Sequence, residues 1–195
     1  MVKITFGLCF FWVFGLCTPS VADEPGQTGS QARPQYHDID AYPKPDYGIN
    51  SLFYIQKNTN TSVVMFEAVR DANGEIDEDD PIHTYWIRYN EDSARGELNY
   101  IERKLAYGTT VTKLEKPGHY EFTVVAFKDK VFEMYKNDKN EIQVNTLIGK
   151  KMSRFHNVYL HLVNNLFIPS IDYIELFGSS LDTGQPVYEK VWIKK

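Results

Sequence analysis

Short runs in which apolar and polar residues alternate dominate the chain after residue 50. Successive side chains of a strand point to opposite faces, so a period of two predicts strands with one or both faces buried. Asn, Asp, Gly and Ser separate the runs at short intervals, which is typical of hairpin-connected antiparallel sheets. The predicted strands are 51–57, 62–69, 83–89, 110–115, 119–128, 130–136, 141–148, 155–163, 170–178 and 186–194.

The stretch 81–108 contains the strand that we expect to be central and the one helix that we predict. In the strand 83–89, Thr84, Trp86 and Arg88 share one face, and aromatic residues also occupy the other face. A strand that is aromatic on both faces is covered on both sides. This pattern favours a place inside the sheet over a place at its edge.

The predicted helix starts at Asp92 or Ser93, either of which can cap it, and ends at Gly108 in the left-handed conformation. Apolar residues at helical spacing form a stripe that we expect to be buried on the sheet. The stripe consists of Ala94, Leu98, Ile101 and Leu105. Together the patterns predict a mainly-β fold, an antiparallel β-barrel or β-sandwich of about nine or ten strands with one short α-helix packed on it, in a single domain over residues 51–195.

Residues 1–22 are typical of a signal peptide, because Lys3 precedes the apolar run 4–17 and small residues lead up to Ala22. A retained membrane anchor is disfavoured, since this run is short for a membrane span. We therefore expect cleavage after Ala22 and a secreted, periplasmic or cell-surface protein that is not an integral membrane protein. Residues 23–50 are rich in Pro, Gly and Gln and predict a flexible tether.

Signal cleavage would remove Cys9 and Cys17, the only two cysteines of the chain. A mature chain without cysteine has no disulfide, no thiolate nucleophile and no cysteine-ligated metal. Cleavage would also remove Lys3 and change the net charge from −5 to −6. An acidic chain with dispersed basic residues makes nucleic acid an unsuitable partner.

Four blocks of the sequence resemble a known family. They are LFYIQKNTNTSVVMFEAV, DPIHTYWIRY, LNYIERKLAYG and IELFGSSLDTGQPVYEK, which together span most of residues 51–189. They are similar to the family called domain of unknown function 4833, small secreted proteins mostly of Bacteroides and their relatives. The resemblance implies an exported single-domain protein. Because the family has no established activity, it implies no catalytic residue.

The most acidic run, 71–80, offers oxygen ligands at a spacing that approaches a calcium loop. The match is poor, because Gly74 is the fourth residue of the run instead of the sixth, and Ile82 stands where a glutamate is required. The alternative is a solvated hairpin loop in which Asn73-Gly74 makes the turn. We favour the hairpin loop and expect no metal site.

Motifs for other chemistry are missing from the sequence. The histidines do not have zinc-ligand spacing, and no GxSxG elbow, P-loop or dinucleotide fingerprint is present. We therefore predict no cofactor and name no catalytic residue.

The strongest candidate site surrounds Arg88, because an arginine on an aromatic strand must be paired or open to a cavity. We expect Trp86, Arg88, Tyr100 and Arg103 to line a pocket between the central strand and the helix. Guanidinium groups suit carboxylates and phosphates, and aromatic rings suit sugars, so the expected ligand is small and anionic or sugar-like. The alternative is an internal ion pair of Arg88 with a core carboxylate such as Glu121 or Glu175.

These features favour a non-enzymatic binding domain or cell-envelope accessory domain, whose partner is such a ligand or another envelope protein. The alternative is a small secreted hydrolase-like enzyme with a site near Arg88, Arg103 and His156. An enzyme would bring a base, a nucleophile or acid and a charge stabiliser together, whereas a binding module would not need that set.

Overall fold

The alternating pattern forms eleven strands in one sheet within residues 42–163 and 170–193, which the computed structural model describes. The predicted signal peptide and most of the predicted tether lie outside these residues. Three short helical turns, η2, α1 and η4, and one π-helical turn, η3, interrupt the strands. The elements are β1 (Ser51–Lys57), β2 (Asn60–Ala68), β3 (Ile82–Arg88), η2 (Tyr89–Glu91), β4 (Ala94–Glu97), α1 (Tyr100–Glu102), η3 (Arg103–Tyr107), β5 (Thr109–Lys113), β6 (His119–Val124), η4 (Val125–Phe127), β7 (Phe132–Lys136), β8 (Ile142–Ile148), β9 (Lys151–Val163), β10 (Ser170–Ser180) and β11 (Pro186–Trp192).

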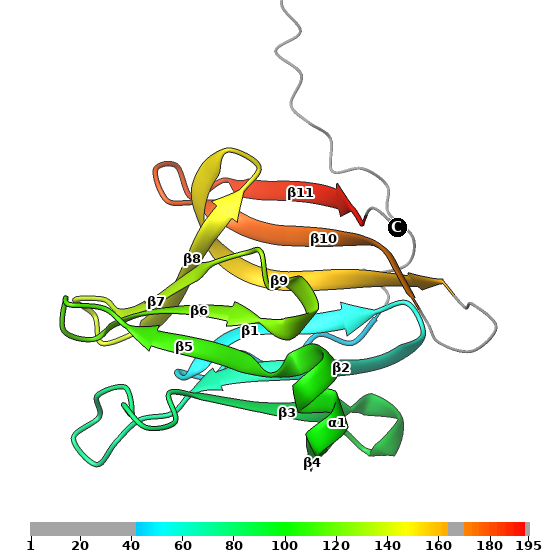
Figure 1. The fold of residues 1–195 in the computed structure, drawn as a ribbon, viewed down its shortest axis with the longest axis horizontal. Helices are drawn as coiled ribbons and strands as arrows, with labels where there is room; N and C mark the ends of the chain where they lie inside the picture. The colour runs from blue at the N-terminus through cyan, green and yellow to red at the C-terminus, as the bar shows by residue number, and fades with distance from the viewer. Residues whose placement is uncertain (1–41, 164–169, 194–195) are drawn as a thin grey trace, which may run out of the picture. The chain divides into compact units, whose positions relative to one another are not determined.

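The sheet divides at β9 into two arms, as Figure 1 shows. One edge of this 13-residue strand pairs with β10 along most of its length, and β11 pairs with β10. The other edge pairs first with β8 and then with β1. One arm therefore runs β1-β2-β3-β4 and the other β8-β7-β6-β5.

The mainly-β prediction with a short helix is confirmed, but the sheet is mixed and not purely antiparallel. The pairing of β1 with β9 is parallel, whereas the other strand pairs are antiparallel. A tight hairpin forces two strands to run in opposite directions, and no hairpin joins β1 to β9. The sheet curls into a half-barrel because its two arms turn toward each other.

Phenylalanine side chains fill the space between the arms. Phe53 of β1 stacks on Phe66 of its own arm at 4.3 Å and on Phe132 of the other arm at 5.7 Å. Phe155 of β9 lies 5.1 Å from Phe53, so the strand that joins the arms also contributes to this cluster. Burying such a ring contributes roughly 1.5–3 kcal/mol, and each aromatic pair adds about 0.5–1.5 kcal/mol.

The strand β3 lies between β2 and β4, one place in from the edge of the sheet, so the predicted place inside the sheet is confirmed. Trp86 belongs to the inner core between the arms. Tyr85, on the opposite face, packs with Tyr54, Val63 and Met65 in a second, smaller apolar cluster. Both faces of β3 are thus covered, as its aromatic alternation indicates.

The predicted helix 92–108 is wrong in its first half. Asp92 and Ser93 adopt left-handed φ angles of 52° and 58°, and they turn the chain into β4, which pairs with β3. The helical segment begins only at α1, where the Asn99 side chain accepts a hydrogen bond from the Glu102 N–H and the Glu102 side chain accepts one from the Asn99 N–H. This capping box is the stronger start signal, because it satisfies two free N–H groups at once.

The prediction that the apolar stripe is buried is likewise only partly correct. Leu98 is 5% exposed and belongs to the inner core. Ile101 and Leu105 are 64% and 69% exposed, because a helical segment that starts after Leu98 no longer keeps them on the same face.

Gly108 does not take the predicted left-handed conformation, since its φ is −64°. A glycine is required here for another reason, because the backbone of residue 108 lies very close to the carbonyl oxygen of Arg103. Its N–H donates to the carbonyl oxygen of Arg103 at 2.8 Å, and a Cβ at this position would lie 2.4 Å from that oxygen. The glycine therefore permits the five-residue turn of η3 to close.

The acidic run 71–80 forms the loop between β2 and β3, with Gly74 at a φ of 79° in the turn. The Asp71 carboxylate accepts hydrogen bonds from the N–H groups of Asn73 and Glu75. Lys136 of β7 pairs with Glu75, and Lys113 of β5 pairs with Glu78. The loop therefore links the two arms of the sheet. Within the described ranges, no group of three or more His, Cys, Asp or Glu side chains is placed to hold a metal.

Candidate functional site

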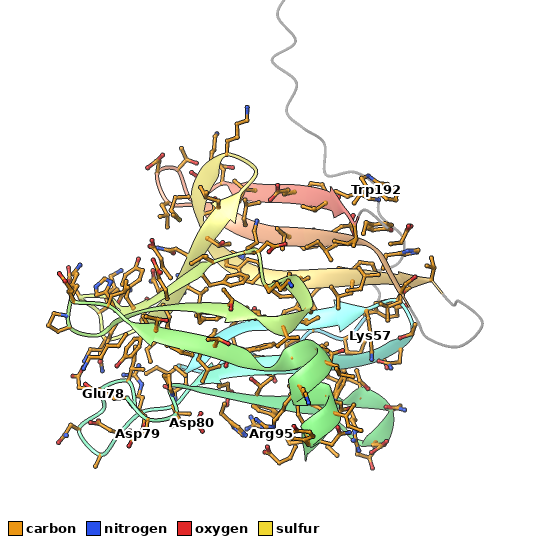
Figure 2. All side chains as sticks on the ribbon, in the orientation of Figure 1. Lys57, Glu78, Asp79, Asp80, Arg95 and Trp192 are labelled. Carbon is orange, nitrogen blue, oxygen red and sulfur yellow. The ribbon has the colours of Figure 1, made fainter. Side chains whose placement is uncertain are left out.

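The polar residues that share the inner face with the core gather at the end of the sheet next to α1. Figure 2 shows Lys57, the last residue of β1, at this end, and Glu78, Asp79 and Asp80 of the acidic loop at the opposite end. Lys57 and the acidic loop thus lie at opposite ends of the sheet.

Trp86 is the centre of this group. Its indole N–H donates to Glu102 Oε1 at 3.2 Å, and the Tyr107 ring meets the indole edge-on at 5.5 Å between centroids. The Lys57 ammonium lies 4.7 Å from the indole centroid, over the ring. We call Lys57, Trp86, Glu102 and Tyr107 the Lys57 cluster.

Lys57 is half-buried by the cluster, and its Nζ atom has no hydrogen-bond or ion-pair partner within the described part of the chain. Burial lowers the pKa of Lys57, because a low-dielectric environment disfavours the charged form, and the charge of Glu102 acts in the opposite direction. The contact with the indole face compensates part of the lost hydration. Lys57 therefore presents a positive charge whose hydrogen bonds remain available.

Glu102 is already occupied by donors. Its Oε1 accepts from Trp86, and its Oε2 accepts from the Asn99 N–H at 2.9 Å. The carboxylate thus fixes the indole to the start of α1 and does not form a close ion pair with Lys57. Burial raises the pKa of the Tyr107 hydroxyl to about 12, and the charge of Glu102 acts in the same direction.

Arg88 lies on the same face of β3 as Trp86. Its guanidinium packs over Gly96, the residue that pairs with Trp86 across β3 and β4, and a Cβ on Gly96 would lie 3.4 Å from Arg88 Cζ. The Arg88 side chain is 44% exposed and pairs with Glu91 at 3.4 Å. The alternative of an internal ion pair with Glu121 or Glu175 is therefore wrong.

Tyr100 and Arg103 do not converge with Trp86 and Arg88. Tyr100 is 73% exposed, with the Lys104 ammonium 5.7 Å from its ring centroid. Arg103 donates to the Leu98 carbonyl oxygen and to Glu97 Oε2 at 3.0 Å. Residues 94–97 form β4 and the helical segment begins only after Asn99, so the long helix that was expected to bring these side chains to Trp86 does not form.

Sequence reasoning missed Lys57 and Glu102, whereas Tyr107 is one of the helix residues expected to converge on the central strand. The period of two places Lys57 on the same face as the core residues Phe53 and Ile55, which was the available signal. The Asn99-x-x-Glu102 pattern of a capping box was the signal for Glu102. No local signal pairs Lys57 with Trp86, because β2 separates their strands.

His156, the third residue of the hydrolase-like alternative, lies at a register shift between β9 and β10. Its Nε2 forms a hydrogen bond with Ser179 Oγ at 3.2 Å, and its carbonyl oxygen accepts from the Tyr47 hydroxyl. Burial lowers the pKa of His156, and the nearby Arg154 charge adds to this shift. Arg88, Arg103 and His156 thus have separate partners.

Comparison with known proteins gives one result. A family model described as a domain of unknown function (DUF4833) matches residues 53–190. No curated protein and no solved structure matches the chain. Among the described residues, no helix has the length and apolar character needed to cross a membrane. The match covers most of the chain and the whole Lys57 cluster, and the chain therefore belongs to the DUF4833 family.

Proposed function

We propose that this protein is an exported binding domain of the cell envelope and that it holds a small anionic ligand at the Lys57 cluster. The observation that carries the proposal is the Lys57 ammonium, which is fixed against Trp86 and lacks a hydrogen-bond partner among the described residues. A half-buried cation in that state gains a charge-assisted hydrogen bond when an anion arrives.

Arg88 supports the same ligand class. Its exposed pair with Glu91 is 3.4 Å long, and exposed pairs of this kind contribute only about 0–1 kcal/mol. A carboxylate or phosphate on the inner face can therefore compete for the Arg88 guanidinium at little cost. Glu102 does not compete for Lys57 in the same way, since its two oxygens already accept hydrogen bonds.

An anionic ligand fits the cluster better than a neutral sugar. Lys57 occupies one face of the Trp86 indole, and Tyr107 lies edge-on against it. A sugar that stacks on the indole would have to displace the lysine, whereas an anion would bind to it.

The test uses Trp86 as a reporter in a Trp192→Phe background, because Trp86 and Trp192 are the only tryptophans after residue 22. Glycolate, succinate and inorganic phosphate are titrated while fluorescence and binding heat are recorded. We expect saturable binding of at least one probe, and a loss of about tenfold or more in affinity for Lys57→Met.

Lys104→Met is the matched control, since Lys104 also lies near an aromatic ring but outside the cluster. It should leave affinity unchanged. An affinity that is the same in Lys57→Met as in the unsubstituted protein, or no saturable signal with any probe, would overturn the proposal.

A further inference from the structure

The surroundings of Lys57 suit a reactive amine as well as a cation that binds an anion. The Nζ atom has no carboxylate or carbonyl partner within the described residues, and it lies 4.7 Å from the centroid of the Trp86 indole, over the ring. An amine must carry a free electron pair to act as a nucleophile, and lysines in apolar surroundings supply one more readily than lysines in water. The burial that lowers the pKa of Lys57 acts in this direction.

We propose that the ligand of the Lys57 cluster is a small carboxylate that also carries an aldehyde or ketone, and that Lys57 binds it through a reversible imine. This inference rests on the proposed function, because the same cluster holds the ligand. It adds the chemical class of the ligand and a covalent step.

The step balances without a further reagent. The Lys57 Nζ electron pair forms a bond to the carbonyl carbon, and a proton moves from nitrogen to the carbonyl oxygen to give a carbinolamine. The C–O bond then breaks, the oxygen leaves as water with a second proton from nitrogen, and the C=N bond forms. Water reverses the sequence and releases the ligand.

The neighbours of Lys57 have distinct parts in this step. Glu102 is the carboxylate whose charge acts on Lys57, and hydrogen bonds from Trp86 and from the Asn99 N–H hold it in place. Arg88 lies on the same face of β3 as Trp86, with its guanidinium over Gly96 of β4, and adds positive charge to this face. The Trp86 indole limits access of water to the amine from one side.

The experiment traps the imine with glyoxylate and sodium cyanoborohydride, which converts it into a stable carboxymethyl-lysine. Peptide mapping by mass spectrometry then compares Lys57 with Lys104 in the same sample, which needs no variant. We expect the adduct to form several-fold faster at Lys57, and excess glycolate to protect Lys57 but not Lys104. Glycolate has the carboxylate but no carbonyl group, so it competes for the site without reacting.

Lys57→Arg separates the two proposals. The arginine keeps a positive charge in the cluster and is not a nucleophile under these conditions, so glycolate should still give a saturable Trp86 signal while adduct at this position is lost. Equal labelling of Lys57 and Lys104 together with saturable glycolate binding would overturn the imine and leave the proposed function standing. If neither glycolate nor glyoxylate changes Trp86 fluorescence saturably and Lys57 is not labelled preferentially, both proposals fail.

Discussion

Two cations on the inner face of the same arm have opposite surroundings, and these surroundings decide their chemistry. Arg88 is solvated and has a weak ion pair with Glu91. Lys57 is half-buried and lies on an indole. An exposed arginine remains charged and can exchange one carboxylate partner for another. A desolvated lysine has a lower pKa, and its charged form gains more from an anionic partner. Lys57 is therefore the stronger contact for an anion, and Arg88 is the more adaptable one.

A second single residue, Gly108, leads to a prediction about stability. Gly108→Ala would place a Cβ 2.4 Å from the Arg103 carbonyl oxygen, so the π-helical turn would have to open. We expect a loss of about 1–3 kcal/mol in the free energy of unfolding, measured by chemical denaturation. Tyr107 precedes Gly108 directly, so the Trp86 fluorescence should also change.

Gly48→Ala is the matched control, because a Cβ there meets only Ser51 Oγ at an ordinary 3.7 Å. Its unfolding free energy should stay within about 0.5 kcal/mol of the unsubstituted value. Equal stability of the two variants would show that the turn tolerates a side chain at residue 108.

The segment from Ala94 to Tyr107 shows how one element can be misassigned from its pattern. Ala94, Leu98, Ile101 and Leu105 have helical spacing, yet the first four residues of the segment pair as β4 with β3. Pairing with an existing strand satisfies several backbone groups, while a new helix must first form a costly nucleus. The helical segment is consequently short. Of the apolar side chains, Leu98 is buried, whereas Ile101 and Leu105 are exposed.

Paired substitutions test this account of the segment. Leu98→Ala should cost about 2–5 kcal/mol, because Leu98 belongs to the inner core. Leu105→Ala should change the unfolding free energy by no more than about 0.5 kcal/mol, since Leu105 is exposed. Urea denaturation of both variants gives the comparison. A large loss for Leu105→Ala would restore the buried stripe that the helical spacing predicts.

For the whole molecule, the two arms are held together at three places. Strand β9 joins them along its edge, the Phe53 and Phe132 rings meet between them, and Lys113 and Lys136 link the acidic loop to the other arm. The Lys57 cluster lies at the opposite end of the sheet from the acidic loop (Figure 2).

Export is the prediction that concerns the whole chain. The charged start, apolar run and small residues before Ala22 predict cleavage at that residue. Mass spectrometry of the protein recovered from outside the cytoplasm should find Asp23 at the N-terminus and no cysteine in the chain. An intact Met1 on a cytoplasmic product would contradict export.

The strands could be predicted because their signal is local. A period of two and the intervening turn residues determine which side chains share a face, and this places Trp86 and Arg88 correctly on one face of β3. Leu98 was also predicted as buried, although for the wrong element. The helix start was predicted too early, because Asp92 and Ser93 are capping residue types as well as turn residue types.

The sequence by itself determined the β-rich character, the turns, the place of β3 inside the sheet and the family of the chain. Only the tertiary structure decided that β1 pairs in parallel with β9, that the arms curl toward each other and that Lys57 lies over Trp86. The physical reason is the range of the interactions. Alternation and turn chemistry act between neighbours in the chain, whereas strand order and side-chain contacts across the sheet depend on which distant segments bury the most apolar surface together.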